Sequence, residues 1–401
     1  MLIYLIFPMK NFLKNFFLLN NFYCDYYSFF LMILTLLIFM IFKEMKMKIL
    51  SKINLWILAM FLFMVFMSLS FIQFYILFEL SMIPILLIVF QSGKQKERIK
   101  SGFYLFFFTL TSSLPTILIL VYFRFIFFLW NFNEENFEVK FKFLLLILLF
   151  MSFFVKLPIF FFHSWLLKAH VQAPVYGSMI LASVLLKLGG FGLFKFLFYY
   201  YNSWLQFMMF YKMLILIGMI VSGAMCLYLT DLKIVIALSS VSHMSFMTLS
   251  MINLMFLNMK GSIIMMVSHG FSSALMFYFF DLYYKRIKTR SIFFSKSVFS
   301  FYMAFFLAII CMINFSIPPS LNFFSEIILT INVLSWLSWL ISAIFIYMFI
   351  STLFSLLLLI FLKDKSKKEF FFNSDLCLSE LMISLFLISM SFMFSLCMFK
   401  I

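Results

Sequence analysis

The sequence predicts an all-α, polytopic membrane protein, and its composition and apolar runs carry that prediction. Of its 401 residues, 66% are hydrophobic and 11% are charged, and the mean hydropathy is +1.15. A soluble domain is about half apolar and about a quarter charged. The apolar residues also gather in continuous runs of roughly 20, which is the length at which a helix crosses a bilayer. A transmembrane β-barrel would instead alternate apolar and polar residues along each strand.

The apolar runs predict about 12 to 14 membrane-spanning helices. Residues 1–19 are apolar but are interrupted by Pro8, Lys10 and Lys14, so a first short helix there is left open. The other spans are expected at 22–42, 52–71, 72–90, 102–130, 141–162, 175–200, 209–229, 232–252, 260–281, 297–317, 321–336, 340–362 and 378–399.

The charges of the loops support this order of spans. Alternation along the chain puts four basic loops on one side of the membrane and the acidic loop 131–140 on the other, which fits the positive-inside rule. The basic loop 363–369 disagrees if residues 321–362 form two spans. Either that region is one long bent span or this loop is an exception. The four basic loops are 43–52, 93–100, 166–170 and 283–290.

The net charge of +16 is attributed to the membrane rather than to nucleic acid. Lysines and arginines beside apolar runs orient helices and meet anionic lipid headgroups. None of the five cysteines forms a Cys-x-x-Cys pair, and no Gly-x-Gly-x-x-Gly or phosphate loop is present. We therefore expect this chain to bind no metal, nucleotide or other cofactor.

Residue usage points to synthesis inside an organelle. The chain has 66 Phe and 32 Met but only 10 Gly and 7 Pro, which fits AT-rich codons and a mitochondrial code with an extra Met codon. An Arg-rich presequence or a cleavable signal peptide is not recognised. We expect a multi-pass membrane protein that is encoded and made in the mitochondrion.

Six ionisable groups fall well inside the predicted spans. A charge at the middle of a bilayer costs about 2.5–3.5 kcal/mol on insertion scales, so such groups face protein or water and find partners. A static ion pair or a neutral buried imidazole is the structural alternative to a functional role. Charges close to span ends, such as Lys195, Asp281 and Glu380, are expected to be interfacial. The six groups are Glu79, Lys156, Lys187, His243, His269 and Glu326.

Prolines lie near three of these groups. Proline lacks a backbone N–H and opens the helix, and in lipid the freed carbonyls need water or polar neighbours. A buried charge beside an opened helix therefore predicts an internal hydrated path. The pairs are Glu79 with Pro84, Lys156 with Pro158, and Glu326 with Pro318 and Pro319.

Groups of this kind can pass protons. Burial favours the neutral form of a lysine, whereas an adjacent carboxylate favours its charged form. A glutamate–lysine pair that closes and separates would therefore make the lysine hold or release its proton. Because we expect no nucleotide or metal site in the chain, the driving energy must come from a partner or an ion gradient.

One stretch carries a family resemblance. FFVKLPIFFFHSWLLKAHVQAPVYGSMILASVLLKLGGFG, residues 153–192, resembles the signature of the chain 4 family of mitochondrial NADH–ubiquinone oxidoreductase, respiratory complex I. That family is similar to subunits of Mrp-type sodium/proton antiporters. The resemblance extends over about residues 22–362. The supporting stretches are YILFELSMIPILLI (75–88), GKQKERIKSGFY (93–104), TDLKIVIALSSVSHMSF (230–246), SHGFSSALMF (268–277) and INFSIPPSLNFFSE (313–326).

The resemblance implies a fold of 14 helices with two inverted five-helix repeats, each holding a helix that is broken at the midplane. It implies shortened N-terminal helices over 1–71, an antiporter-like core over 72–362, and a C-terminal loop and last helix over 363–401. The implied role is proton translocation, coupled at a distance to NADH oxidation and ubiquinone reduction. NADH, FMN, iron–sulfur clusters and ubiquinone would serve the assembled complex. The implied partners are other membrane subunits, especially the antiporter-like chains 2 and 5, and lipids such as cardiolipin.

The resemblance also assigns roles to the residues that match. Glu79 matches a glutamate that pairs with a lysine, here Lys156. Lys187 matches the lysine that leads to the centre, His243 a central histidine, and Glu326 the glutamate near the exit. Ser325 stands where glycine is usual. The secondary positions along the path are His163, His170, Lys233 and His269.

Two alternatives stay open at this point. A free-standing cation/proton antiporter would use the same charges, but it would need a cluster of ion-binding carboxylates, and the sequence shows only isolated ones. A structural membrane scaffold would hold the buried charges as static pairs. The proteins that co-purify with the chain would separate complex I from the antiporter.

Overall fold

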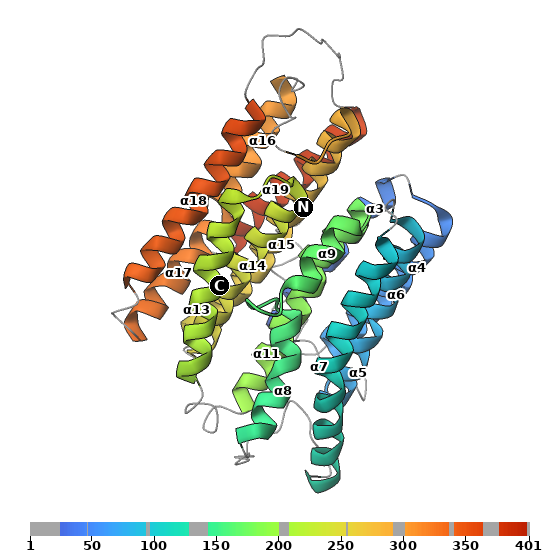
Figure 1. Ribbon diagram of the computed structural model, residues 1–401, viewed down its shortest axis with the longest axis vertical. Coiled ribbons are helices and arrows are strands. Elements are labelled where there is room, and N and C mark those ends of the chain that lie inside the picture. The colour runs from blue at the N-terminus through green and yellow to red at the C-terminus, as the bar shows by residue number, and fades with distance from the viewer. Residues whose placement is uncertain are drawn as a thin grey trace.

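The described part of the chain is a bundle of long helices that run side by side (Figure 1). The computed structural model describes residues 25–45, 47–93, 97–127, 143–199, 208–253, 256–291, 301–336, 341–363 and 377–398. Within these ranges nine helical segments are long and apolar enough to cross a membrane. The prediction of an all-α, polytopic membrane protein is confirmed. An isolated antiparallel bridge pairs Asp231 with Ser291.

The first helices match the predicted spans closely. They are α3 (Tyr26–Glu44), α4 (Ile49–Met67), α5 (Phe71–Leu80), α6 (Met82–Ser92) and α7 (Arg98–Phe127). Helices α5 and α6 form one crossing that is interrupted at Ser81. Pro84 has no N–H, so the carbonyl of Leu80 lacks its usual helical donor. The predicted short helix in residues 1–19 lies outside the described residues.

The predicted span 141–162 is wrong beyond Lys156. Helix α8 (Phe143–Lys156) ends there, and a turn leads to α9 (Ser164–Gln172). Pro158 cannot donate to Phe154, whose carbonyl accepts instead from the N–H of Ile159 at 3.3 Å. The indole N–H of Trp165 donates to the carbonyl of Val155 at 2.9 Å. The carbonyls of Phe154 and Val155 thus both find donors inside the protein, as a membrane interior favours.

The predicted loop 166–170 is also wrong, because these residues form the middle of α9. Leu166, Ala169 and His170 are buried. Helix α7 packs along both α8 and α9, so the two helices together make one interrupted crossing beside α7. The next crossing is continuous and consists of α10 (Val175–Ile180), a π-helical turn η1 (Leu181–Leu185) and α11 (Leu186–Tyr199).

The second half begins with α13 (Met208–Tyr228), α14 (Leu232–Met251) and the long α15 (Phe256–Ile287). Helices α16 (Phe301–Asn314) and α17 (Leu321–Trp336) follow in the chain, and both pack against α15. Phe306 lines a cavity with Leu282 near the end of α15, whereas Ser325 reaches Met265 at 3.1 Å, nearer its start. The two predicted spans 297–317 and 321–336 are therefore a single crossing, broken around Pro318 and Pro319.

Because α16 and α17 make one crossing, α18 ends on the same side of the bundle as α15. Helix α18 (Ile341–Lys363) runs back beside α13 and α16, and α19 (Leu378–Met398) starts next to the end of α15 (Figure 1). Arg286 contacts Glu380 at 2.9 Å. Neither sequence-based alternative for 321–362 is correct. Helix α17 shares its crossing with α16, which precedes it, and α18 is a separate crossing. Residues 364–376 themselves lie outside the described residues.

The basic segments meet at one end of the bundle, which we call the basic end. Its members are the start of α4, the end of α6, the end of α9, the start of α14 and the end of α15. The grouping fits the predicted positive-inside pattern; the acidic loop 131–140 lies outside the described residues. The contacts that define the basic end are Asn54 to Gln91 at 3.1 Å, Lys233 to Ala173 at 3.0 Å and Leu232 to Arg290 at 3.1 Å.

The described helices contain two consecutive sets of five crossings. In the first set, over residues 49–199, the fourth crossing is interrupted between α8 and α9. In the second, over 208–363, the fourth is interrupted between α16 and α17. Since five is odd, the second set starts from the opposite end of the bundle. That is the arrangement an inverted repeat requires, although the repeat itself and the proposed domain limits 1–71, 72–362 and 363–401 stay predictions.

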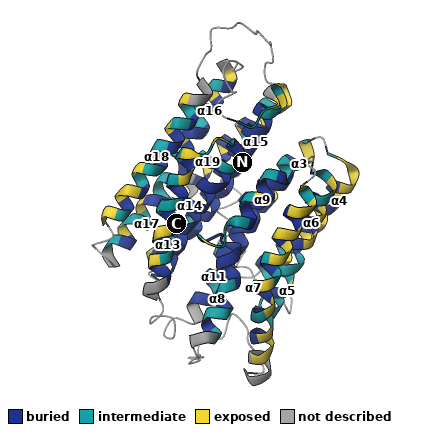
Figure 2. Ribbon diagram, viewed as in Figure 1, coloured by how far each residue is buried: buried dark blue, intermediate teal, exposed yellow. Residues whose placement is uncertain are grey.

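Burial separates a central layer from an outer one. In the crossings 175–197, 232–251 and 257–286, 94% of the most apolar window is buried, against 33% for α7 and for α18. Figure 2 shows the same contrast, with α11 and α14 dark and α7 and α18 carrying yellow segments. Exposed apolar side chains on the outer helices suit contact with lipid. The central helices are where polar groups can lie away from it.

We expect Gly192→Ala to destabilise the contact between α11, α8 and α5. A Cβ at Gly192 would lie 2.3 Å from Cε1 of Phe153 and 2.9 Å from Cζ of Phe74. Both rings are packed among other aromatic rings and cannot move freely. Such overpacking costs about 1–3 kcal/mol. The midpoint of thermal unfolding of the purified protein in detergent should therefore fall.

Gly190→Ala is the matched control, since its Cβ would first meet only the mobile end of Met266 at 2.9 Å. Equal midpoints for the two variants would contradict the packing described here.

Candidate functional site

The six predicted ionisable groups lie on six central or near-central helices, each close to the middle of its crossing. Five of them are buried, with exposed fractions of 4% or less. Glu79, on α5, retains a side-chain exposure of 17%. These groups form three sets along the bundle, and the members of each set contact one another.

The first set is the ion pair of Glu79 and Lys156. The Nζ atom of Lys156 lies 2.7 Å from Oε1 of Glu79 and 3.0 Å from the centroid of the Phe78 ring. Lys156 is the last residue of α8, and Glu79 is the penultimate residue of α5. Each charge thus lies at a helix interruption, where backbone groups can be reached by water or side chains. The predicted pairing of these two residues is present, while its role in proton transfer stays a prediction.

The second set joins Lys187 to His269. The π-turn just before Lys187 directs the N–H of Leu186 to the carbonyl of Leu181, five residues back. The carbonyl of Ala182 therefore accepts from Lys187 Nζ at 2.6 Å. The same ammonium lies 2.8 Å from Nδ1 of His269 on α15. The π-turn, a feature often found at functional sites, orients this lysine.

The third set contains His243, Glu326 and Tyr347. His243 Nδ1 lies 3.6 Å from Oε1 of Glu326 and 3.0 Å from the hydroxyl of Tyr347. The ring of His243 is 5.7 Å from the ring of His269, measured between centroids. The third set therefore adjoins the second. A proton could pass between the two rings with an intervening water or a ring rotation.

Lys156 and Lys187 belong to segments that touch. A Cβ at Gly189 would lie 3.1 Å from Cγ of Leu157 and 3.4 Å from Cβ of Lys156. The absence of a side chain at Gly189 thus lets α11 lie against the break after α8. The three sets follow one another from α5 through α11 and α15 to α17.

The secondary residues have different surroundings. His170 is buried and stacks on Phe277 with ring centroids 4.8 Å apart, and neither of its ring nitrogens has a hydrogen-bond partner among the described residues. Lys233 donates to the carbonyl of Ala173 at the end of α9. His163 stacks on Phe160 at the break and is partly exposed. Within the described ranges its Nδ1 atom has no hydrogen-bond partner.

Tyr347 was missed by sequence reasoning. It lies in a strongly apolar span, where an aromatic residue reads as part of the core; its hydroxyl was the available signal, since a buried tyrosine O–H usually finds a partner. A row of buried serines on α14 was missed as well. Their hydroxyls donate to carbonyls of their own helix, as Ser239, Ser242 and Ser245 do.

Charges near the helix ends form ion pairs outside the three sets, as expected for interfacial residues. Arg124 is also expected near a span end, but its side chain lies outside the described residues. The pairs are Lys195 with Asp25, Lys285 with Asp281 at 2.7 Å, and Arg286 with Glu380 at 2.9 Å.

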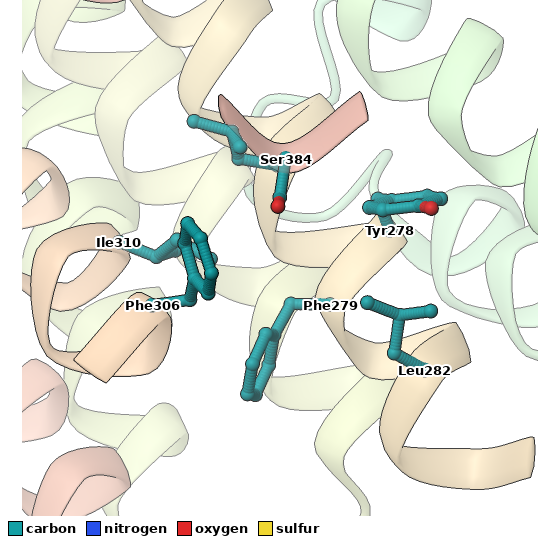
Figure 3. A pocket seen from close by; sticks show the side chains of 7 residues that line it. Tyr278, Phe279, Leu282, Phe306, Ile310 and Ser384 are labelled. Carbon is teal, nitrogen blue, oxygen red and sulfur yellow. The ribbon is translucent and has the colours of Figure 1, made fainter. Parts of the chain in front are cut away.

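A cavity between α15, α16 and α19 is separate from these groups (Figure 3). Tyr278, Phe279, Phe306 and Ser384 line it, and ionisable side chains other than the phenol of Tyr278 are absent from its lining. It therefore offers no continuation of the three sets. Over the described ranges, groups of three or more His, Cys, Asp or Glu side chains that could hold a metal ion are not found.

Comparison with known proteins gives one consistent family. Residues 68–353 match the family described as NADH:quinone oxidoreductase/Mrp antiporter, transmembrane. The NADH-ubiquinone oxidoreductase chain 4 of Apis mellifera ligustica is 38% identical over 369 residues, covering 88% of this chain and 82% of the relative. The chain 4 of Artemia franciscana is 40% identical, covering 70% of this chain and 71% of the relative.

Solved structures show the same fold at low identity. A chain of respiratory complex I from Thermus thermophilus has a TM-score of 0.80 at 18% identity, covering 92% of this chain and 79% of that one. A chain of the Mrp complex from Dietzia sp. has a TM-score of 0.80 at 12% identity, covering 94% and 81%. These likenesses support the fold alone.

Lys233→Met should destabilise the end of α9. The ammonium donates to Ala173 and lies 3.5 Å from the carbonyl of Val171, and a cation is favourable at a helix C-terminus. Loss of this charged donor to a buried carbonyl is expected to cost about 1–3 kcal/mol. Faster amide hydrogen exchange in α9 and a lower midpoint of thermal unfolding would report it.

The control is Lys285→Met, which removes an exposed lysine paired with Asp281 one turn away. Such pairs contribute about 0.5 kcal/mol or less. An effect as large as that of Lys233→Met would count against the capping role of Lys233.

Proposed function

Because the chain belongs to the NADH:quinone oxidoreductase/Mrp antiporter transmembrane family, we propose that it works as a core membrane-arm subunit of respiratory complex I. It translocates protons across the membrane, coupled at a distance to NADH oxidation and ubiquinone reduction. The resemblance inferred from the stretch 153–192 is confirmed by the curated relatives. They are named as chain 4 of this enzyme, which favours complex I over a free-standing antiporter.

The observation that carries the proposal is the succession of buried ionisable groups across the middle of the bundle. It starts at Glu79, passes through Lys156, Lys187 and the two histidines, and ends at Glu326. Burying so many titratable groups in a membrane is costly, and groups that are retained there are usually functional. Carboxylates, ammoniums and imidazoles can each hold and pass a proton.

Each group then has a role in the transfer. Glu79 controls Lys156: with the pair closed the ammonium keeps its proton, and with the pair separated the buried lysine tends to release it. Lys187 receives the proton and shares it with His269. His243 passes it to Glu326 at the exit. His163, His170 and Lys233 line the surroundings of this path as secondary groups.

The helix interruptions are the places where water would enter the path. Lys156 lies at the break before Pro158, and Glu326 follows the break at Pro318 and Pro319. The amide of Asn322 donates to the carbonyl of Ile313 at 3.1 Å across the second break. Polar groups at both places make hydration of the gaps favourable.

Cofactors and partners follow from the assembly. NADH, FMN, the iron–sulfur clusters and ubiquinone are held by other chains of the complex, and the energy of their redox reactions reaches this chain through contacts between subunits. The antiporter-like chains 2 and 5 are the proposed neighbours. Anionic lipids such as cardiolipin bind at the basic end. The complex lies in the mitochondrial inner membrane, where the chain is also synthesised.

A free-standing cation/proton antiporter is the second candidate, since the fold is shared with a chain of an Mrp complex. Purification of the chain from its native membrane discriminates between the two. Co-purification of complex I subunits supports the first function. Recovery of the chain alone, with ion-driven proton flux in vesicles, would replace it with the second.

Lys187→Met should remove proton transfer through this chain while the complex still assembles. The methionine fills a similar volume but cannot hold a proton, so the link from Lys156 to His269 is cut. The measurement is the number of protons translocated per electron by the assembled complex in vesicles. A normal ratio would defeat the relay and would favour a static scaffold.

The matched control for this variant is Lys195→Met, two turns further along α11. Lys195 pairs with Asp25 near the helix end and lies outside the three sets, so its loss should leave the ratio unchanged.

Glu79→Gln should lower proton translocation without preventing assembly. The amide can still accept a hydrogen bond from Lys156 but no longer favours its charged form. The rate of proton uptake during NADH oxidation should therefore fall, together with the proton-to-electron ratio. Glu380→Gln, which breaks the pair with Arg286 outside the relay, serves as the control. Unchanged turnover and coupling in Glu79→Gln would mean that the pair does not control Lys156.

A further inference from the structure

The hydroxyl of Tyr347 contacts a histidine of the proposed proton path, although tyrosine is not one of the groups that carry the proton in it. It lies on α18, is 1% exposed, and packs on Phe246 with ring centroids 5.2 Å apart. Its hydroxyl lies 3.0 Å from Nδ1 of His243. A phenol can donate one hydrogen bond and can also accept. Placed inside an apolar span, this hydroxyl is directed at one ring nitrogen of the proposed relay.

The same nitrogen has a second candidate partner. His243 Nδ1 also lies 3.6 Å from Oε1 of Glu326. At any moment this nitrogen either carries a hydrogen, which it donates, or presents a lone pair, which accepts. Tyr347 and Glu326 therefore compete for one atom. Which of them bonds to it depends on where the proton is.

An ionised Glu326 can only accept hydrogen bonds, so it favours the imidazolium form of His243, which carries hydrogen on both Nδ1 and Nε2. Once the proton has moved, the N–H bond at Nδ1 is broken and an O–H bond is formed on Glu326. The imidazole is then left with a lone pair at Nδ1. The hydroxyl of Tyr347 can donate to that lone pair while keeping its own hydrogen covalently bound. In this state the lone pair at Nδ1 is engaged, and return of the proton requires that this hydrogen bond be broken.

We propose that Tyr347 is a positioning residue that disfavours return of the proton from Glu326 to His243. This inference rests on the proposed function, because it needs Glu326 to be loaded through His243. Tyr347 itself exchanges no proton with either group. It stabilises the unloaded imidazole by bonding to the Nδ1 lone pair, so return of the proton is less favourable when the proton gradient opposes the transfer.

The test is Tyr347→Phe in the assembled complex, reconstituted in vesicles. The variant keeps the ring that packs on Phe246 and removes only the hydroxyl. The proton-to-electron ratio is measured first with the gradient collapsed and then against a large opposing gradient. One hydrogen bond shifts such an equilibrium about fivefold, so the return of protons should speed up by about that factor. The ratio should be normal without the gradient and clearly lowered against it.

The matched control is Tyr211→Phe. It removes a hydroxyl from a buried ring on α13 that packs on Phe154. Its proton-to-electron ratio should equal that of the parent protein at both gradients. Two results for Tyr347→Phe would overturn the proposal: an unchanged ratio at both gradients, or an equal loss at both, which would indicate general damage to the path. If Tyr347→Phe does not assemble, Tyr347→Met is the second variant, with the same expected loss. Failure of both to assemble would make the hydroxyl a structural requirement and would also overturn it.

The failure of this inference can be told apart from failure of the relay. A normal ratio in Lys187→Met removes the relay and the inference together. If Lys187→Met lowers the proton-to-electron ratio but Tyr347→Phe matches the parent protein at both gradients, only the role of Tyr347 is removed.

Discussion

The constraint on which this structure depends is the cost of holding a charge in the middle of a membrane. Lys156 and Glu79 meet that constraint by pairing at 2.7 Å, and Lys187 meets it by bonding a backbone carbonyl and an imidazole. Both solutions need helices that depart from regular geometry, because an unbroken helix offers no free carbonyl and no room for water. The breaks and the π-turn are therefore part of the same arrangement as the charges.

At both broken helices a side chain bonds a carbonyl that the break exposes. The indole of Trp165 bonds the carbonyl of Val155 at the first break, and the amide of Asn322 bonds the carbonyl of Ile313 at the second. Side chains thus replace the backbone donors that proline removes. The central helices can then carry polar groups while the outer helices present apolar side chains to lipid. The two tasks are divided between layers of the bundle.

Much of this could be predicted from the sequence, since hydropathy finds long apolar runs and the buried charges stand out within them. The limits of these methods appear at 141–172. Hydropathy cannot show that the run ends at Lys156, and α9 resembles a loop because it carries Lys168 and His170. Likewise, the two runs around Pro318 look like separate spans, because only packing against α15 shows that they share one crossing. Tyr347 could not be recognised because an aromatic residue in an apolar run does not differ from its neighbours in hydropathy enough to stand out.

The π-turn at Leu181–Leu185 has a consequence for how such a site can arise. A π-turn accommodates one extra residue in an otherwise regular helix, and each residue advances a helix by about 100°. Every side chain after the insertion is therefore rotated relative to those before it. In the uninterrupted version of this crossing Lys187 would point away from His269. Gain or loss of a single codon in this stretch would therefore change both the contact between Lys187 and His269 and the packing of the buried side chains that follow it.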